Sequence, residues 1–374
     1  MDSRNPEPVE FTDADRAWMS EALRLAENGC FSTTPNPRVG CLLVRDGQAV
    51  GRGWHARAGE PHAEIHALRD AGDAARGATA YVTLEPCSHH GRTPPCAEAL
   101  IAAGVSRVVA AMADPNPQVA GRGLERLRAA GIAVASGLME NEARALNPGF
   151  ISRMTRGRPW VRLKAAASLD GKTALGNGQS QWITGPAARR DGHYFRARAC
   201  AILSGMGTVK NDDPQLNVRE IETSRQPLKI VVDSRLEISP GARLFADGKI
   251  LLVSALDLPG KARHLLMGKN AEWLCLPGSG NRVDLAALMR ELGRREINEV
   301  HVEGGPRLNG ALIAAGLADE LLLYLAPCLL GNKARDLFDL PELVALPERH
   351  PLQIQSVTRI GDDWRLIGLL RPIP

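Results

Sequence analysis

The chain has 374 residues, of which 44% are hydrophobic and 24% charged, and its formal net charge is +4. This composition is typical of a globular protein long enough for two hydrophobic cores, and it excludes a disordered chain, a collagen and a coiled coil. The longest apolar run, residues 321–330, is shorter than the roughly 18 residues of a membrane helix, and the acidic start lacks the features of a signal peptide. We therefore expect a cytoplasmic protein with no membrane partner.

The two halves of the chain differ in charge. Residues 1–150 contain 15 Arg, no Lys and 18 acidic residues, a net charge of −3, whereas residues 151–374 carry +7. The acidic first half is a poor match for a polyanion. The basic second half favours phosphorylated small molecules over nucleic acid as ligands.

The first 150 residues predict an α/β domain. A helix begins with an N-cap at Thr12-Asp13 and ends at Asn28-Gly29 with a glycine C-cap. Asp46-Gly47 predicts a hairpin between strands 39–44 and 48–54. Further on, helices alternate with strands, which indicates a sheet covered by helices. The predicted helices are 62–71, 94–103 and 124–130, and the predicted strands are 78–84, 107–113 and 132–135.

A second α/β domain is expected after a linker. Residues 147–159 are rich in Gly, Pro and Arg and lack apolar periodicity, which predicts the linker there and domains over residues 11–150 and 159–374. The strands predicted in the second domain are 161–166, 201–204, 229–233, 250–254, 299–303 and 321–326, and its helices are 186–199, 284–292 and 308–315.

A zinc site is predicted in the first domain. His62 begins a helix, Cys87 follows a strand and Cys96 lies near the start of the next helix, and zinc prefers these ligand types. Three protein ligands leave a fourth position for a water molecule, which zinc activates for attack on a ring carbon. Glu64 would face that water and transfer protons. His-x-Glu followed by Pro-Cys is the signature of zinc deaminases.

Other interpretations of this pattern stay open. Structural zinc sites usually have four protein ligands, and His89 or His90 could be the fourth, or the cysteines could simply be buried. Eight residues separate Cys87 from Cys96, compared with two in the common deaminase signature. The inserted segment 88–95 is polar and basic, which suits a phosphorylated substrate. The seven cysteines, an odd number in a long chain, indicate reduced thiols rather than a disulfide framework.

Longer motifs resemble one enzyme family. Thr-Pro-Asn-Pro-Arg-Val-Gly at 34–40, His-Ala-Glu at 62–64 and the run 86–96 resemble the deaminase half of the bifunctional riboflavin-biosynthesis deaminase/reductase family. Motifs in the second half are similar to its reductase half, and the resemblance extends from about Phe11 to the C-terminus. These motifs are 164–172, 180–184, 208–214 and 302–306. The resemblance implies a cytidine-deaminase-like α/β/α zinc domain followed by a dihydrofolate-reductase-like α/β domain.

The resemblance also implies two consecutive reactions. The first domain would hydrolyse the 2-amino group of a diaminopyrimidinone that carries a ribosylamino 5′-phosphate, and the second would reduce the ribosyl group to ribityl with NADPH. One zinc per chain would be bound by His62, Cys87 and Cys96 with Glu64 as proton shuttle, and the protein would form a homodimer or larger oligomer. Four other residues would contact the pyrimidine or its phosphate, although His89 could be a solvated loop histidine and Asn36 only a turn former. They are Asn36, His55, His89 and Arg92.

In the second half, Glu303-Gly-Gly-Pro306 lies where a strand ends and a helix begins, and backbone N–H groups at such a turn can bind phosphate. No Gly-x-Gly-x-x-Gly follows a strand, so an ordinary Rossmann site is not supported. By the resemblance, the residues lining NADPH would be Ala166, Trp182, Thr208, Asp212, Ser234, Gly305, Pro306, Arg307, Leu308, Asn309, Gly310 and Ala311. Those binding the substrate would be Lys164, Ser180, Arg196, Leu216, Arg219 and Glu303.

Several of these roles have a simpler alternative. Arg196 and Arg219 would clamp the ribose phosphate, or they are ordinary surface arginines. Lys164 would polarise the imine that accepts hydride, or it is a solvated lysine at a strand end. Trp182 would lie against the nicotinamide, or it fills the core. The hydroxyl of Ser234 and its neighbour Arg235 are the candidates for binding the 2′-phosphate of NADPH.

Two other classes of function stay open. A tRNA or single-strand base deaminase would need a basic, aromatic-rich surface on the first domain, which the 15 Arg and 18 acidic residues there disfavour. A non-enzymatic zinc-stapled module would have a fourth ligand and no nicotinamide cofactor. We favour the two-step enzyme, with a phosphorylated pyrimidine substrate and no nucleic-acid partner.

Overall fold

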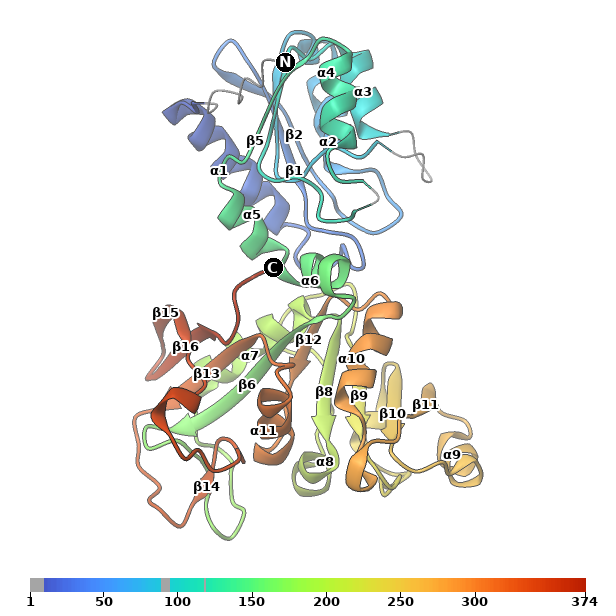
Figure 1. Cartoon of the computed structure of the whole chain (residues 1–374), viewed down its shortest axis with the longest axis vertical. Helices are drawn as coiled ribbons and strands as arrows, with labels where there is room; N and C mark the ends of the chain where they lie inside the picture. Colours follow the sequence, from blue (N-terminus) through green and yellow to red (C-terminus); the bar gives the residue numbers. More distant parts are fainter. Residues whose placement is uncertain (1–9, 89–94, 118) are drawn as a thin grey trace. The chain divides into compact units, whose positions relative to one another are not determined.

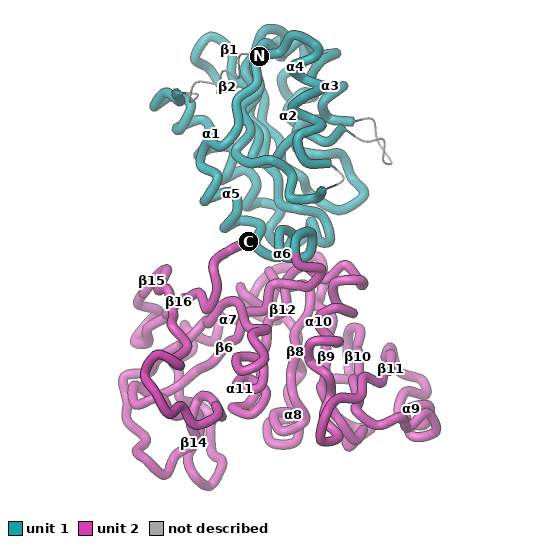
Figure 2. Tube along the Cα trace, viewed as in Figure 1, with its two compact units in different colours: residues 1–155 teal, residues 156–374 magenta. Residues whose placement is uncertain are grey.

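Residues 10–88, 95–117 and 119–374 are described by a computed structural model, and the chain divides into two units, residues 1–155 and 156–374 (Figure 2). Each unit combines a sheet with covering helices (Figure 1). This confirms the predicted α/β class. Within the described residues no helix has both the length and the apolar character needed to cross a bilayer.

The sheet of the first unit has five strands in the order β2-β1-β3-β4-β5. The predicted hairpin is confirmed, because Asp46 and Gly47 have φ angles of 52° and 71°, the left-handed conformations of a two-residue hairpin turn. β1 pairs antiparallel with β2 and β3, whereas β3, β4 and β5 are parallel. The strands are β1 (Gly40–Arg45), β2 (Gln48–Trp54), β3 (Thr79–Val82), β4 (Arg107–Ala110) and β5 (Ala133–Ser136).

Helices cover both faces of this sheet. α1 and α5 lie on one face and α2, α3 and α4 on the other (Figure 1). The predicted N-cap of α1 is confirmed, since the Thr12 hydroxyl accepts from the Asp15 N–H and the Asp15 carboxylate accepts from the Thr12 N–H. The helices are α1 (Asp13–Glu27), α2 (Ala63–Ala71), α3 (Cys96–Ala103), α4 (Arg122–Ala129), α5 (Glu140–Leu146) and α6 (Pro148–Arg156).

Two expectations for this unit are wrong. The C-cap of α1 is Asn28, whose backbone is in the right-handed helical region, and not a glycine in the left-handed region. A glycine is required at position 29 for a different reason, because a Cβ there would lie 2.6 Å from the carbonyl oxygen of His55. The segment expected to be an irregular linker contains α6. Phe150 and Ile151 of α6 pack into the core of the first unit, so tertiary contacts support a helix in spite of the low helix propensity of Gly149.

The second unit contains a nine-stranded sheet in the order β11-β10-β9-β8-β12-β6-β13-β16-β15. The strands from β11 to β13 in this order are parallel, and the β15–β16 hairpin continues the sheet antiparallel. The strands are β6 (Trp160–Ser168), β8 (Ala201–Gly205), β9 (Leu228–Val232), β10 (Ile250–Ser254), β11 (Ala271–Cys275), β12 (Glu299–Val302), β13 (Glu320–Ala326), β15 (Gln353–Ile360) and β16 (Asp363–Leu369).

Every strand predicted for this unit is confirmed, and β11, β15 and β16 were not predicted. The two residues Gly361-Asp362 join β15 to β16, and that dipeptide is a hairpin signal in the sequence. A separate two-stranded ribbon pairs β7 (Lys172–Ala174) with β14 (Arg335–Asp336). The helices are α7 (Pro186–Arg198), α8 (Met206–Asp212), α9 (Pro259–Leu266), α10 (Leu285–Arg294) and α11 (Pro306–Ala314).

Candidate active sites

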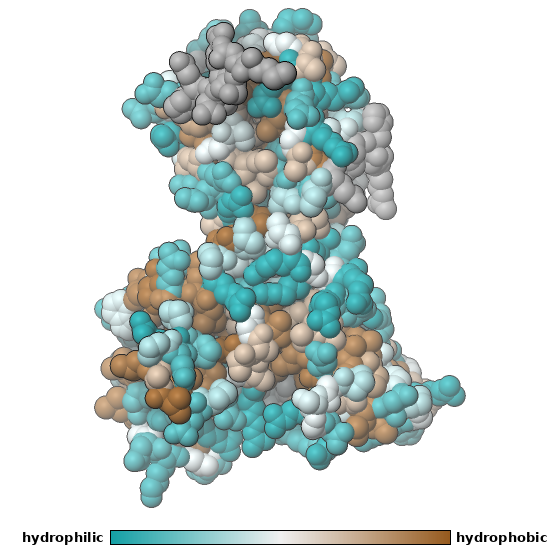
Figure 3. Space-filling view, in the orientation of Figure 1, coloured by the Kyte–Doolittle hydropathy of each residue, from teal (hydrophilic) through white to brown (hydrophobic). Residues whose placement is uncertain are grey.

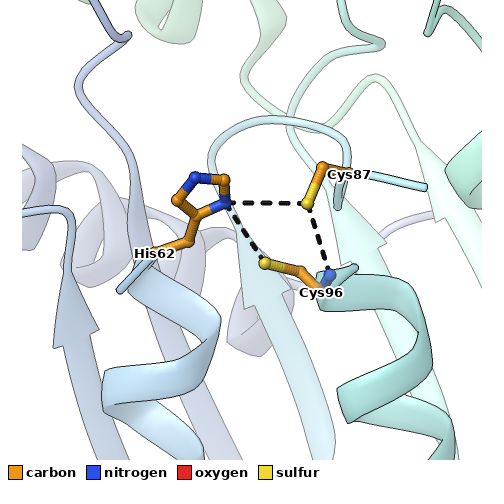
Figure 4. Close-up of side chains that lie close together, drawn as sticks. All are labelled: His62, Cys87 and Cys96. Atoms are coloured by element: carbon orange, nitrogen blue, oxygen red, sulfur yellow. Dashed lines mark hydrogen bonds between the residues drawn. The ribbon is translucent and has the colours of Figure 1, made fainter. Parts of the chain in front are cut away.

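Three ligand atoms converge at one end of the first unit's helices. His62 is the N-cap residue of α2, Cys96 is the first residue of α3, and Cys87 lies on the loop after β3. The Nδ1 atom of His62 lies 3.6 Å from the Cys87 sulfur and 3.3 Å from the Cys96 sulfur (Figure 4). The predicted triad is therefore brought together by three separate elements.

These distances fit zinc. With Zn–S near 2.3 Å and Zn–N near 2.0 Å, tetrahedral geometry puts the nitrogen and sulfur ligands about 3.5 Å apart. All three ligand atoms lie within 4.8 Å of one another, and among the residues outside 1–9, 89–94 and 118 this is the one cluster of its kind. Hydrogen bonding with Cys96, and then with His62, lowers the pKa of Cys87 to about 4, so this sulfur is prepared to bind as a thiolate. Candidate fourth ligands His89 and His90 fall outside the described residues, as does Arg92.

Glu64 lies beside the triad on the first turn of α2. Its side chain is 3% exposed, and within the described part of the chain its Oε2 atom has no hydrogen-bond partner. Burial, with the nearby charge of Cys87, raises the pKa of Glu64 to about 7. A buried carboxyl group with a free oxygen can both accept and donate a proton at neutral pH, which suits a general acid–base.

Asn36 and His55 also meet next to the triad. The Asn36 amide nitrogen lies 3.1 Å from Nε2 of His55, and Nδ1 of His55 lies 3.2 Å from the carbonyl oxygen of Pro61. These partners fit a neutral ring that donates from Nδ1 and accepts at Nε2, and burial lowers the pKa of His55. The ring of His55 contacts that of His62 edge to face, with centroids 5.3 Å apart.

Glu85 has a role that the sequence did not predict. Its buried carboxylate accepts four backbone N–H bonds of 2.8–3.3 Å from Asp114, Gly121, Gly123 and Leu124. Gly123 is required at the start of α4, since a Cβ there would lie 1.9 Å from the Pro86 carbonyl oxygen. Glu85 thus ties the loop before α4 to the residues that precede Cys87. Its position in the motif Glu85-Pro86-Cys87 was the available signal.

A large cleft occupies the second unit. Its volume is about 1840 Å³, compared with about 300–1,000 Å³ for typical ligand pockets, so a dinucleotide and a second ligand could bind together. Ten cationic and six acidic side chains line it, which favours anionic ligands. Every residue predicted to bind NADPH or substrate in this half lines the cleft except Gly310. Gly310 instead packs against the backbone of Asp339, where a Cβ would lie 1.9 Å from the carbonyl oxygen.

The predicted phosphate-binding turn lies in the wall of this cleft. Gly305 is the N-cap of α11, and a Cβ on Gly305 would lie 3.9 Å from the Thr208 hydroxyl. Asn309 donates to the Gly304 carbonyl oxygen at 3.2 Å and holds the turn in shape. The start of α11 therefore lies beside Thr208 in the cleft wall, and a helix N-terminus in such a position can bind phosphate.

Arg196 and Glu303 form an ion pair in the cleft. Nε and Nη2 of Arg196 donate to the two carboxylate oxygens of Glu303 at 2.5 and 2.7 Å, and Nη1 donates to the Asn217 carbonyl oxygen at 3.0 Å. Arg196 is therefore not an ordinary surface arginine. The three nitrogens of the Arg196 side chain already have partners, whereas the Arg219 side chain makes one hydrogen bond within the described residues, from Nη1 to Oδ1 of Asn217.

Lys164 and Trp182 do not fit their simpler alternatives, a solvated lysine at a strand end and a tryptophan that fills the core. Lys164 lies inside β6 rather than at a strand end, and its ammonium is 5.9 Å from the centroid of the Tyr324 ring. Burial lowers the pKa of Lys164. Trp182 is 68% exposed and stacks against Arg189 at 4.5 Å, which excludes a core role. Leu216 has a left-handed φ of 49°, a strained conformation for this residue in a cleft wall.

Comparisons with known proteins cover both units. Residues 12–112 match the cytidine and deoxycytidylate deaminase zinc-binding region, and residues 159–366 match the RibD C-terminal domain. The chain is 50% identical over 368 residues to the riboflavin biosynthesis protein RibD of Escherichia coli, covering 93% of this chain and 97% of that protein. It is 48% identical over 373 residues to RibD of Haemophilus influenzae, covering 96% and 98%.

Solved structures agree with this similarity. Acinetobacter baumannii RibD has a TM-score of 0.87 and 42% identity, covering 95% of this chain and 98% of that chain. A Thermotoga maritima diaminohydroxyphosphoribosylaminopyrimidine deaminase/5-amino-6-(5-phosphoribosylamino)uracil reductase has a TM-score of 0.84 and 32% identity, with coverage of 95% and 98%. The similarity therefore extends over both units in one chain.

Proposed function

The chain belongs to the RibD family of riboflavin biosynthesis proteins, and on that basis we propose which residues of each unit carry out its two reactions. It is a bifunctional enzyme, a zinc-dependent deaminase and an NADPH-dependent reductase. The reactions are hydrolysis of 2,5-diamino-6-(5-phosphoribosylamino)pyrimidin-4(3H)-one and reduction of its deaminated product to 5-amino-6-(5-phosphoribitylamino)uracil. The observation that supports the deaminase most directly is the convergence of His62, Cys87 and Cys96 beside the buried Glu64.

In the first unit we assign proton transfer to Glu64. Zinc bound by the triad would supply an activated water molecule as nucleophile. Glu64 would take a proton from the attacking water and deliver it to the ring nitrogen, and would then protonate the amino group, which leaves as ammonia. Asn36, held by His55, would contact the pyrimidine edge. We keep the assignment of His89 and Arg92 to the substrate as a proposal.

In the second unit, NADPH would supply hydride to the sugar C1′. We place its phosphates at the start of α11, near Thr208, and its nicotinamide beside Trp182. The cleft brings Lys164 and Glu303 close enough to interact electrostatically, and Lys164 would stabilise or protonate the nitrogen-bearing end of the reacting bond. Arg219 is the better candidate for the ribose phosphate, while Arg196 orients Glu303.

The decisive experiment uses the full, zinc-loaded chain and the diaminopyrimidine substrate, with and without NADPH, followed by mass spectrometry. Without NADPH, we expect the product in which oxygen replaces the amino group. With NADPH, we expect that product to gain two hydrogen atoms. An unchanged substrate would refute the deaminase assignment, and a deaminated but unreduced product would refute the reductase assignment.

We also propose that the enzyme is cytoplasmic and works as a homo-oligomer. The edge strand β15 supports a contact with a second copy, because among the described strands it has a neighbour on one side only, and it carries the exposed Ile354 and Val357. Apolar side chains also gather over the β15–β16 hairpin in Figure 3. Light scattering should give a multiple of the 40.2 kDa chain mass, and Val357→Lys should reduce it.

A further inference from the structure

Arg38 belongs to the motif 34–40, but it has no role in either reaction as described above. It is a buried arginine, 8% exposed, on the segment between α1 and β1. Its Nη1 donates to the carbonyl oxygen of Leu146 at 2.7 Å and its Nε to that of Cys30 at 3.4 Å. A buried guanidinium is stable only when it is bonded in this way, so Arg38 is fixed relative to the end of α5.

Asn147 binds the backbone of Arg38. It lies between α5 and α6 and is 4% exposed. The Arg38 N–H donates to Oδ1 of Asn147 at 2.8 Å, and Nδ2 of Asn147 donates to the Arg38 carbonyl oxygen at 2.8 Å. The side-chain amide thus satisfies both polar backbone groups of one residue, as a neighbouring strand would.

A third contact holds the segment on the other side of Asn36. Nη2 of Arg153, on α6, donates to the carbonyl oxygen of Pro35 at 3.0 Å. Pro35 and Pro37 flank Asn36 and have no N–H to donate. The Asn36 N–H donates locally to the Thr33 carbonyl oxygen at 2.9 Å, and the residues on both sides of Asn36 are also held by bonds from the α5–α6 segment, more than 100 residues away in the sequence.

The position of Asn36 matters at the metal triad. Its amide nitrogen contacts Nε2 of His55, whose Nδ1 is held by the Pro61 carbonyl oxygen, and His62 follows directly. A shift of the Asn36 backbone would break the contact with His55 and displace the Asn36 side chain, which we propose contacts the pyrimidine. An error of about 1 Å in such a positioning group is enough to reduce catalysis strongly.

We propose that Asn147 is a positioning residue of the deaminase: by binding the Arg38 backbone it fixes Asn36 beside His55 and thereby sets the affinity for the pyrimidine. This inference rests on the proposed function, in which Asn36 contacts the substrate. It assigns a role in the first reaction to the α5–α6 segment, which contributes no ligand to the metal.

The test compares Asn147→Ala with Asn141→Ala, a matched change at an exposed position of α5. We expect Asn147→Ala to raise the deaminase KM about tenfold, the effect of losing roughly one buried hydrogen-bonded group, while zinc content remains unchanged. Reductase turnover on deaminated substrate should stay the same and serves as an internal control. A role in stability alone would instead lower the folded fraction and kcat without changing KM, and that result would overturn the proposal.

A double-variant comparison shows whether Asn147 acts through Asn36. If it does, Asn36→Ala/Asn147→Ala should have the same KM as Asn36→Ala alone. Multiplicative effects of the two changes would overturn the positioning role while leaving the proposed function intact. A parent enzyme without deaminase activity would overturn both. If Asn147→Ala does not fold, Asn147→Asp replaces it, because a carboxylate can still accept from the Arg38 N–H but cannot donate to the Arg38 carbonyl oxygen. We expect an increase in KM of about threefold, and an unchanged KM would overturn the proposal.

Discussion

The guanidinium of Arg196 and the carboxylate of Glu303 face each other through two hydrogen bonds of 2.5 and 2.7 Å in the cleft of the second unit. Burial alone would raise the pKa of Glu303, but the charge of Arg196 outweighs it and holds this pKa well below its ordinary value. Glu303 is therefore ionised at neutral pH and can only accept hydrogen bonds. A donor in the reduction has to be another group, and Lys164 lies in the same cleft.

Arg196→Lys should impair the reductase, because an ammonium cannot reproduce two parallel bonds to a carboxylate. Losing one charge-assisted bond of about 1.5–3 kcal/mol predicts a fall in kcat/KM of roughly tenfold to a hundredfold. Steady-state NADPH oxidation measures it. Arg294→Lys, at an exposed position of α10, is the matched control, and deaminase activity should be unaffected. An unchanged reductase rate in Arg196→Lys would show that the pair is not needed in this geometry.

Glu64→Gln should abolish deamination while zinc remains bound at one ion per chain. The amide nearly matches the carboxylate in shape but cannot transfer protons, and Glu64 is not one of the three converging ligands. Ammonia release and metal analysis measure the two properties, and reduction of supplied deaminated substrate should continue. Cys87→Ser is the contrasting variant, expected to lose the metal because a hydroxyl is a poorer zinc ligand than a thiolate. Retained ammonia release in Glu64→Gln would remove Glu64 from its role.

The sequence predicted features that depend on neighbouring residues and missed those that depend on distant ones. The Thr12 cap and the Asp46-Gly47 turn are local, and both are confirmed. Helix α6 was missed because its buried face is defined only by the core against which it packs. The bond between Arg38 and Asn147 spans 109 residues, and no periodicity in the chain indicates it.

The same distinction applies to the candidate sites. The zinc triad could be predicted because His-x-Glu followed by Pro-Cys is characteristic of the chemistry, although the spacing of the two cysteines departs from the common signature. The pairing of Arg196 with Glu303 could not, because each residue separately resembles a phosphate or substrate ligand. Gly310 was grouped with the cofactor because it belongs to a continuous run, yet it lies beyond the first turn of α11 and packs against the backbone of Asp339, a contact that the local sequence does not indicate.

Asp15→Asn should destabilise the first unit in a pH-dependent way. Burial would raise the pKa of Asp15, but bonds from Arg107 and Tyr81 outweigh it and lower this pKa far below the ordinary 3.8. The carboxylate therefore contributes stability above pH 3.8, and this contribution is lost as the pH falls through the depressed pKa. We expect a loss of about 1–3 kcal/mol at pH 7.

Thermal unfolding followed by circular dichroism at a series of pH values measures this effect. The difference in Tm between Asp15→Asn and the parent should be largest near neutral pH and should shrink in acid. Asp13→Asn, at an exposed position in the same helical turn, should cause much less change. A difference in Tm that does not vary with pH would mean that Asp15 acts through packing rather than charge.

The reductase should prefer NADPH to NADH, and we expect Arg235 to contribute to that preference. Its side chain is 70% exposed in the cleft lining beside Ser234, so it can reach a ligand, and Glu237 is its nearest acidic group at 3.9 Å. Lys210 also pairs with Glu237, and Lys261 lies close to both Glu237 and Arg235, so positive charge is in excess here and can attract the dianionic 2′-phosphate. A charge-assisted contact of about 1.5–3 kcal/mol corresponds to roughly tenfold to a hundredfold in affinity.

Arg235→Ala should therefore raise the Kd for NADPH, measured by its fluorescence on binding, and leave the Kd for NADH almost unchanged. The control is Arg263→Ala, an equal loss of charge at an exposed position outside the cleft, and it should change neither Kd. Equal losses for both cofactors in Arg235→Ala would assign Arg235 to general binding, and equal use of both cofactors by the parent enzyme would refute the preference itself.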